Sequence, residues 1–163
     1  MTATLFLTDN ICRTMGDVSI MDDAGFRTPT GYRRIDDADL TDTMEDYLEM
    51  IARISQEAEV VRIKDLAARL HVSPSSASRM ADQLRERGYV SFSRYGYVTM
   101  TEQGRAYGAY LIFRHATVLA FLRALNQCDD VLEEAEKIEH ALTVRTVENL
   151  GRATEELKKM HPQ

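Results

Sequence analysis

The segment from residue 61 to residue 90, VRIKDLAARLHVSPSSASRMADQLRERGYV, constrains the fold more than any other part of the chain. Apolar residues recur at helical spacing in both halves, and His71-Val72 between them forms a tight turn, in which histidine tolerates positive φ better than most residues. Ser73 is a strong N-cap, and Pro74 at the first helical position has no N–H to leave unsatisfied. Two short helices joined by such a turn predict a helix-turn-helix. Its buried positions are Ile63, Leu66, Ala67, Leu70, Ala77, Met80, Ala81 and Leu84, and Gly88 follows the second helix.

The residues after Gly88 predict a β-hairpin followed by helices. Strand-forming residues from Val90 to Phe92 and from Val98 to Met100 flank Arg94-Tyr95-Gly96, as in the wing of a winged helix. Thr101 is placed to cap a long helix that ends near Leu125, with an apolar stripe of Tyr107, Leu111, Val118, Leu122 and Leu125. Apolar spacing also predicts helices over about 43–59, 130–142 and 144–160.

These elements predict a mainly α protein. An N-terminal winged helix-turn-helix domain (41–105) is followed by an all-helical metal-binding and dimerisation domain (106–163). Residues 1–40 show no sustained period and contain many turn-forming residues, which indicates a flexible extension. The segment from residue 142 to residue 150 carries more apolar side chains than a terminal hairpin needs for its own packing: Leu142, Val144, Val147 and Leu150. We therefore expect a two-fold interface that uses this segment and the long helix.

Charge and cysteine content narrow the class of protein. The net charge is −6, but residues 60–105 carry eight basic against four acidic side chains, which favours a polyanion-binding face in the middle of the chain. We find no run of about 18 apolar residues and no secretory signal. Cys12 and Cys128 form no CxxC pair and fit free thiols in the cytoplasm.

The exposed face of the second helix of the helix-turn-helix carries short hydroxyls at its start and longer donors beyond. Such a set can approach a phosphate closely and then reach base edges in double-stranded DNA, while the wing tip suits backbone contact. The alternative is an ordinary solvated face. The candidate DNA-binding residues are Ser73, Ser75, Ser76, Arg79 and Gln83 on the helix, with Arg94 and Tyr95 on the wing.

Two acidic segments carry candidate metal ligands at helical spacing. Asp46 and Glu49 stand at i, i+3, and Glu136, Glu139 and His140 at i, i+3, i+4, in both cases opposite the apolar stripe. The alternatives are solvated carboxylates and, for His115 on the long helix, a histidine satisfied within the core. Together the six residues would form an oxygen-rich site with two imidazoles, which suits Mn²⁺ or Fe²⁺ better than a structural Zn²⁺ site.

The stretches TMEDYLEMI, HVSPSSASRMADQLRERGYV, VTMTEQGRAYG, RHATVLAFL and EAEKIEHALT resemble the diphtheria-toxin-repressor family, most closely its manganese transport regulator branch (MntR). The resemblance covers about residues 41–160. It implies a homodimeric repressor of manganese uptake genes that binds operator DNA when loaded with Mn²⁺, with up to two ions per subunit. The metal ligands it implies are Asp46, Glu49, His115, Glu136, Glu139 and His140.

The same resemblance separates manganese from iron sensing. The iron-sensing branch has Met where this chain has Asp46 and Cys where it has Glu136, and its ancillary site needs an acidic residue where this chain has Leu119. An Fe²⁺-responsive repressor and a metal-independent winged helix regulator stay open as alternatives. A di-metal hydrolase is disfavoured because nothing in the sequence supplies a distinct nucleophile, so we do not expect an enzyme.

Overall fold

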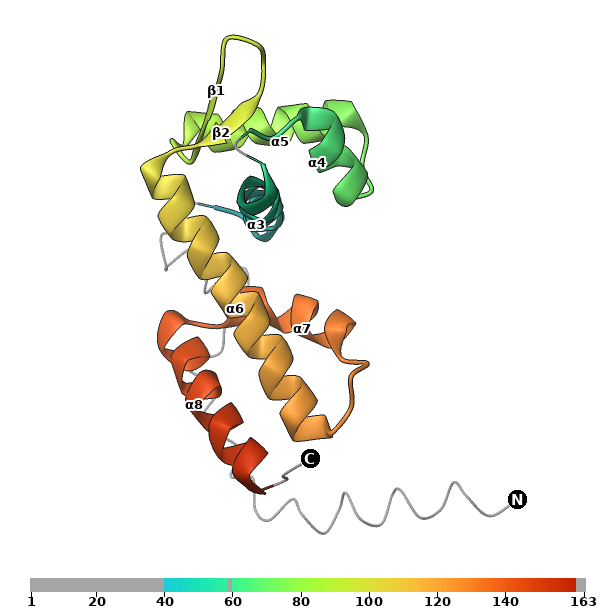
Figure 1. Ribbon diagram of the computed structural model, residues 1–163, viewed down its shortest axis with the longest axis vertical. Coiled ribbons are helices and arrows are strands. Elements are labelled where there is room, and N and C mark those ends of the chain that lie inside the picture. Colours follow the sequence, from blue (N-terminus) through green and yellow to red (C-terminus); the bar gives the residue numbers. More distant parts are fainter. Residues whose placement is uncertain (1–39, 59, 161–163) are drawn as a thin grey trace, which may run out of the picture. The chain divides into compact units, whose positions relative to one another are not determined.

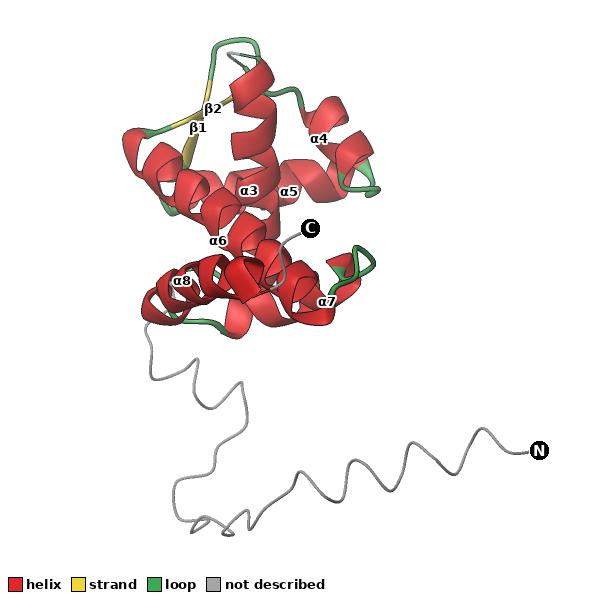
Figure 2. Cartoon of the chain, turned by 60° about the horizontal axis from the view of Figure 1, so that its bottom comes forward, coloured by secondary structure: helices red, strands yellow, loops and turns green. Residues whose placement is uncertain are grey.

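The structure is a computed structural model that describes residues 40–58 and 60–160; the predicted extension over residues 1–40 lies almost wholly outside them. The described part is mainly helical, with one two-stranded hairpin, as predicted (Figures 1 and 2). In chain order the elements are α3 (Asp42–Glu57), α4 (Ile63–Arg69), α5 (Pro74–Glu86), β1 (Val90–Phe92), β2 (Val98–Met100), α6 (Glu102–Asn126), α7 (Leu132–Ile138), the 3₁₀ turn η2 (Glu139–Ala141) and α8 (Val144–Met160).

The helix-turn-helix of α4 and α5 has the predicted caps. His71 in the turn has φ of 53°, and Ser73 caps α5 by accepting a hydrogen bond from the backbone N–H of Ser76 at 3.1 Å. Gly88 follows the C-cap of α5 with φ of 81°, a conformation that glycine adopts without steric cost. Local capping chemistry therefore sets both ends of α5.

The wing is an antiparallel hairpin in which Val90 pairs with Met100 and Phe92 with Val98 (yellow in Figure 2). Gly96 turns the chain with φ of 74°, and Tyr95 beside it is 80% exposed. An isolated bridge between Val61 and Val98 joins the wing to the segment that precedes α4. The wing is thus fastened to the helix-turn-helix while its tip projects into solvent.

One apolar core joins α3 to the helix-turn-helix and the start of α6. Thr41 caps α3, so this helix begins at Asp42, one residue before the predicted start. Its apolar stripe, from Met44 to Ile54, is buried. Gly108 allows α6 to lie tightly on α3, because a Cβ there would come within 2.8 Å of the Ala52 side chain. The predicted core residues Ile63, Leu70 and Met80 are half-buried at the edge of this cluster.

Helix α6 runs from the wing past α3 to α7 and α8, so it carries side chains into both halves of the described part (Figure 1). Leu111, Val118 and Leu122 of its predicted stripe are buried, but Leu125 is 51% exposed, which corrects the prediction. The reason is that α6 ends at Asn126, and the chain that turns back through Val131 covers Leu122 and leaves Leu125 uncovered.

By length and composition alone, α6 is also long and apolar enough to cross a membrane, which corrects the expectation that no segment qualifies. Two observations favour a core helix instead. Arg114, near its middle, is 3% exposed and pairs with Glu45 of α3, and the helix packs along α3 and α8.

The helix predicted over 130–142 is shorter than expected. It ends at Ile138 as α7 and continues as the 3₁₀ turn η2, where the backbone N–H of Leu142 bonds to the carbonyl of Glu139 at 3.2 Å. Tightening from i+4 to i+3 bonding changes the direction in which the next side chains leave the helix. This change decides where Glu139 and His140 point.

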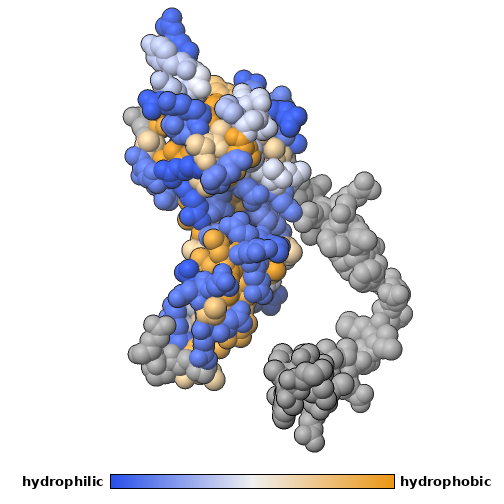
Figure 3. All heavy atoms as spheres, turned by 90° about the vertical axis from the view of Figure 1, so that its right-hand side faces the viewer, coloured by the Kyte–Doolittle hydropathy of each residue, from blue (hydrophilic) through white to orange (hydrophobic). Residues whose placement is uncertain are grey.

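The last helix, α8, matches the predicted range. Of the residues expected at a two-fold interface, Val147 is buried within its own chain, and Leu142 and Leu150 pack on the second core cluster around Val118. Val144 is exposed, as are Phe113 and Leu125 of α6. Figure 3 shows apolar surface interleaved with polar surface over this part of the molecule.

Candidate metal centre

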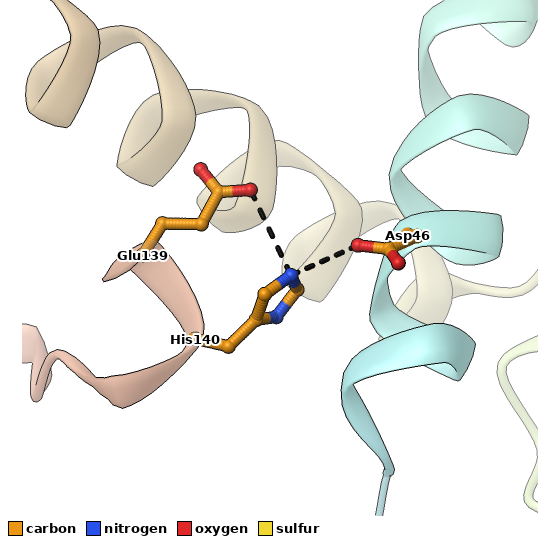
Figure 4. Close-up of side chains that lie close together, drawn as sticks. All are labelled: Asp46, Glu139 and His140. Atoms are coloured by element: carbon orange, nitrogen blue, oxygen red, sulfur yellow. Dashed lines mark ion pairs between the residues drawn. The ribbon is translucent and has the colours of Figure 1, made fainter. Parts of the chain in front are cut away.

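Asp46 of α3 meets Glu139 and His140 of η2 at the first of two clusters of ionisable side chains. The Nε2 atom of His140 lies 2.9 Å from Oδ1 of Asp46 and 3.8 Å from Oε1 of Glu139 (Figure 4). The ligand atoms of the three residues lie within 4.8 Å of one another. A site of this size can be bridged by one ion, so we name Asp46, Glu139 and His140 the first cluster.

The second cluster consists of Glu49, His115 and Glu139, whose ligand atoms again lie within 4.8 Å of one another. His115 Nδ1 is 3.1 Å from Oε2 of Glu139 and 4.0 Å from Oε1 of Glu136. Glu139 therefore contributes to both clusters, one oxygen toward each. All six predicted ligands come together, and five of them line one pocket of about 300 Å³: Asp46, Glu49, His115, Glu136 and Glu139.

The helical wheel misplaced two of these residues. Glu49 and Glu139 were predicted opposite the apolar stripe, yet both are buried, with Glu139 only 1% exposed. The reason is that α6 packs along α3, and side chains of α7 and η2 meet Asp46 and Glu49 at the pocket and the two clusters. Asp46 and Glu136 stay at the rim of the pocket, with exposed or half-exposed side chains.

A third group, which sequence reasoning missed, lies beside the first cluster. The guanidinium of Arg114 donates to Oε2 of Glu45 at 2.8 Å, and Tyr107 donates its hydroxyl hydrogen to Oε1 of the same carboxylate. His140 Nδ1 lies 2.9 Å from Oε2 of Glu45. A signal was present, because Arg114 interrupts the otherwise apolar run LIFRHATVLAF directly before His115.

These contacts orient the ring of His140. Glu45 accepts a hydrogen bond, so the proton of Nδ1 points to Glu45 and Nε2 faces Asp46 and Glu139. Burial alone would raise the pKa of Glu45, but hydrogen bonds from His140 and Tyr107 and the charge of Arg114 lower it to about 2. Glu45 thus stays ionised and orients the ring so that Nε2 faces the carboxylates of Asp46 and Glu139.

The electrostatics of both clusters favour bound positive charge. Burial opposes a charged His140, but hydrogen bonds to Asp46 and Glu45 raise its pKa to about 10. A hydrogen bond to Glu139 raises the pKa of His115, and burial raises the pKa of Glu49, with the nearby charge of Glu139 adding to it. Buried carboxylates are stable only with a cation or a proton beside them.

The donor set fits a divalent transition metal. Carboxylate oxygens and imidazole nitrogens are ligands for Mn²⁺ and Fe²⁺, and no cysteine lies in the pocket among the residues that the structure describes. The residues that would hold such an ion are the five of the two clusters and Glu136. The positive charge of the ion would replace the proton that His140 otherwise keeps.

Metal affinity is expected to rise with pH, because an ion at Nε2 of His140 must displace a proton whose pKa is about 10. One displaced proton predicts an affinity increase of about tenfold per pH unit between about pH 6 and 8. The free energy of unfolding of the metal-free protein should follow the opposite trend. The raised pKa of His140 contributes to it fully below pH 6.5, and this contribution is lost as the pH rises through about 10. Calorimetric titrations with Mn²⁺ at several pH values measure the first trend; a pH-independent affinity contradicts it.

The predicted DNA-binding residues lie at the start of α5 and on the wing. Ser75 and Arg79 are exposed and Ser76 and Gln83 half-buried, while Arg94 and Tyr95 stand at the exposed wing tip. The hydroxyl oxygen of the Ser73 cap lies 2.9 Å from those of both Ser75 and Ser76, which holds the three hydroxyls together at the positive end of the helix.

Comparison with known proteins adds two family matches. The family model "Iron dependent repressor, N-terminal DNA binding domain" matches residues 39–98, and the model "Iron dependent repressor, metal binding and dimerisation domain" matches residues 101–162. The HTH-type transcriptional regulator MntR of Geobacillus kaustophilus is 32% identical over 112 residues, which cover 68% of this chain and 79% of that protein. The regulator of the same name from Bacillus subtilis is 31% identical over the same shares.

Solved structures show the same fold. The structure of the manganese regulator SloR has a TM-score of 0.62 and 27% identity, and covers 71% of this chain. The metal-dependent transcriptional regulator MtsR has a TM-score of 0.64 and 24% identity, and also covers 71%. The chain spans about half the length of these solved chains, 55% in both cases.

Proposed function

Because the chain belongs to the iron-dependent repressor family of metal-dependent, DNA-binding transcriptional regulators, we propose that it is a homodimeric repressor activated by Mn²⁺. The observation that carries this proposal is the convergence of six hard ligands from the two ends of the described part. Asp46 and Glu49 come from α3, which packs on the helix-turn-helix. The others are His115, Glu136, Glu139 and His140 on α6, α7 and η2.

The mechanism follows from this placement. Without a metal ion, the carboxylates of Asp46, Glu49 and Glu139 are offset only in part, by the proton of His140 and by Arg53, and their remaining repulsion loosens the contact of α3 with α6 and η2. Asp46, Glu49 and Glu139 would hold a divalent cation, whose positive charge would offset the remaining repulsion between them. The contact then holds α3, and the helix-turn-helix packed on it, in one orientation relative to the dimerisation helices.

In a dimer, this orientation sets the distance between the two α5 helices. Half-sites on DNA stand about 34–36 Å apart, so only one arrangement of the recognition helices reaches successive major grooves. DNA affinity rises because the competent arrangement is no longer a minor member of an ensemble. We assign DNA binding to residues 41–105, metal binding and dimerisation to residues 106–163, and the protein to the cytoplasm, with manganese uptake genes as its targets.

A DNA-binding titration tests the proposal. An operator is first selected from a random DNA pool with the Mn²⁺-loaded protein, and binding is then measured anaerobically with Mn²⁺, Fe²⁺, Zn²⁺ and no metal. Binding that requires Mn²⁺ and a dimeric mass support the proposal. Equal binding without metal favours a metal-independent regulator, and stronger activation by Fe²⁺ favours an iron sensor.

Asp46→Met is expected to shift metal selectivity toward Fe²⁺. The carboxylate of Asp46 lies 2.9 Å from His140 in the first cluster, and a thioether in its place favours softer ions. The measurement is the ratio of the Fe²⁺ and Mn²⁺ concentrations that half-saturate operator binding, with Asp42→Met in the first turn of α3 as the control. An unchanged ratio would show that Asp46 does not set selectivity.

Arg79→Ala is expected to weaken operator binding by about 1–3 kcal/mol and to leave Mn²⁺ affinity unchanged. Arg79 is exposed on α5, so a DNA contact of its guanidinium is expected to have no part in holding the metal ion. Fluorescence anisotropy at matched salt measures the loss. Arg152→Ala on α8 is the control for a change of one charge, and operator affinity equal to wild type contradicts the assignment of this face.

A further inference from the structure

Arg53 forms an ion pair inside the candidate metal centre. Its Nε and one terminal nitrogen both donate to Oε1 of Glu49, at 2.8 and 2.6 Å. The two residues stand at i, i+4 on α3, and Arg53 lines the same pocket as the second cluster of Glu49, His115 and Glu139. The guanidinium side chain is 37% exposed and that of Glu49 only 10%, so Arg53 reaches from the surface to a buried carboxylate.

This pair gives Glu49 a counter-ion of its own. Glu49 is otherwise close to the like charge of Glu139, which adds to the effect of burial in raising its pKa. Both hydrogen bonds join charged groups, and charge-assisted hydrogen bonds are stronger than bonds between neutral groups. The positive charge of Arg53 also acts on His115, which places it within the electrostatic range of the whole cluster.

The first cluster lacks such a residue. Among the described side chains, no lysine or arginine forms an ion pair with Asp46 or Glu139, and Arg114 nearby donates to Glu45 instead. The second cluster therefore has an arginine as a counter-ion, whereas the first has, in the described part of the chain, only a histidine. An ion at the second cluster must share Glu49 with a guanidinium that is covalently tethered one helical turn away.

We propose that Arg53 is a built-in competitor for the second cluster and sets the metal concentration at which that cluster fills. This inference rests on the proposed function and refines it, because it concerns the number of ions bound at a given Mn²⁺ concentration. If Arg53 instead orients Glu49 for an ion, removing its charge should weaken the binding of the second ion.

The test is a titration of the full-length protein with Mn²⁺, followed by the electron paramagnetic resonance signal of the free ion. Wild type, Arg53→Met and Arg53→Lys are compared; methionine keeps the length and helix propensity without the charge, and lysine keeps the charge without the forked donor. The control is Arg69→Met, which removes the same charge from an exposed pair with Glu57.

We expect Arg53→Met to bind the second ion about threefold to tenfold more tightly, as loss of a partly buried charged hydrogen bond implies. Arg53→Lys should lie between it and wild type, and Arg69→Met should match wild type. The melting temperature supplies a second readout. Without metal, Arg53→Met should melt lower than wild type, because Glu49 loses its counter-ion, and with saturating Mn²⁺ this deficit should disappear.

Two results overturn the inference alone: a second ion that binds Arg53→Met as weakly as wild type or more weakly, and a single ion bound by every variant. A wild type that binds no Mn²⁺ at millimolar concentration overturns the proposed function, and this inference with it. The two failures are therefore distinguished by whether the first ion binds.

Discussion

Replacing Glu139 with glutamine is expected to abolish metal-activated DNA binding. Glu139 is 1% exposed and is the one residue that belongs to both clusters, with Oε1 toward His140 and Oε2 toward His115. Glutamine keeps the shape of the side chain but removes the negative charge and one oxygen. Loss of residues that merely support a ligand costs 10–100-fold in metal affinity, so loss of a shared ligand should cost at least about 100-fold.

The measurement combines Mn²⁺ titration with operator binding at a fixed Mn²⁺ concentration. Glu133→Gln on α7, the helix that precedes η2, is the matched control, because Glu133 is highly exposed and pairs with Lys137 instead of the clusters. Metal-free Glu139→Gln should remain folded, because loss of a like charge beside Glu49 offsets loss of the charged hydrogen-bond partner of His115. Mn²⁺ affinity within about threefold of wild type would exclude Glu139 as a shared ligand.

Replacing Arg114 with methionine is expected to lower the free energy of unfolding by about 3–5 kcal/mol. The change leaves Glu45 ionised and 12% exposed, with His140 and Tyr107 but without its guanidinium. Urea denaturation of metal-free protein at neutral pH measures the loss. The double variant Glu45→Gln, Arg114→Met removes both charges and should recover part of it.

The pair of Glu45 and Arg114 also predicts how the free energy of unfolding changes at acid pH. The pKa of Glu45 is lowered from 4.5 to about 2, so its contribution to stability is present above pH 4.5 and is lost as the pH falls toward 2. Between pH 4.5 and about 2, the free energy of unfolding should fall less in Arg114→Met than in wild type. An unfolding free energy within about 1 kcal/mol of wild type at neutral pH would contradict a structural role for this buried pair.

Local patterns predicted the DNA-binding part well because its elements are specified by neighbouring residues. Ser73 caps α5 through a hydrogen bond to a residue three positions away, and His71 and Gly88 adopt left-handed φ within single turns. Such interactions depend on sequence neighbours alone, so they can be read before the tertiary structure is known.

The burial of the site residues could not be predicted in this way. A helical wheel for α3 shows one apolar stripe and places Glu49 on the polar side, but α6 and η2 cover that side as well. A wheel reports which residues share a face and says nothing of what packs on it. The burial of Val147 and the exposure of Leu125 were misjudged for the same reason.

The sequence by itself determined the helix-turn-helix, the wing, the long helix after it and, through spacing and resemblance, the six candidate ligands. Only the tertiary structure decided how the candidate ligands are distributed between the two clusters. It joined Asp46 to His140, Glu49 to His115 and Glu139 to both, and it set Arg53, Glu45 and Arg114 beside them. The physical reason is that electrostatic contacts depend on distances in space, and Glu45 and His140 lie 95 positions apart in the chain but 2.9 Å apart in the fold.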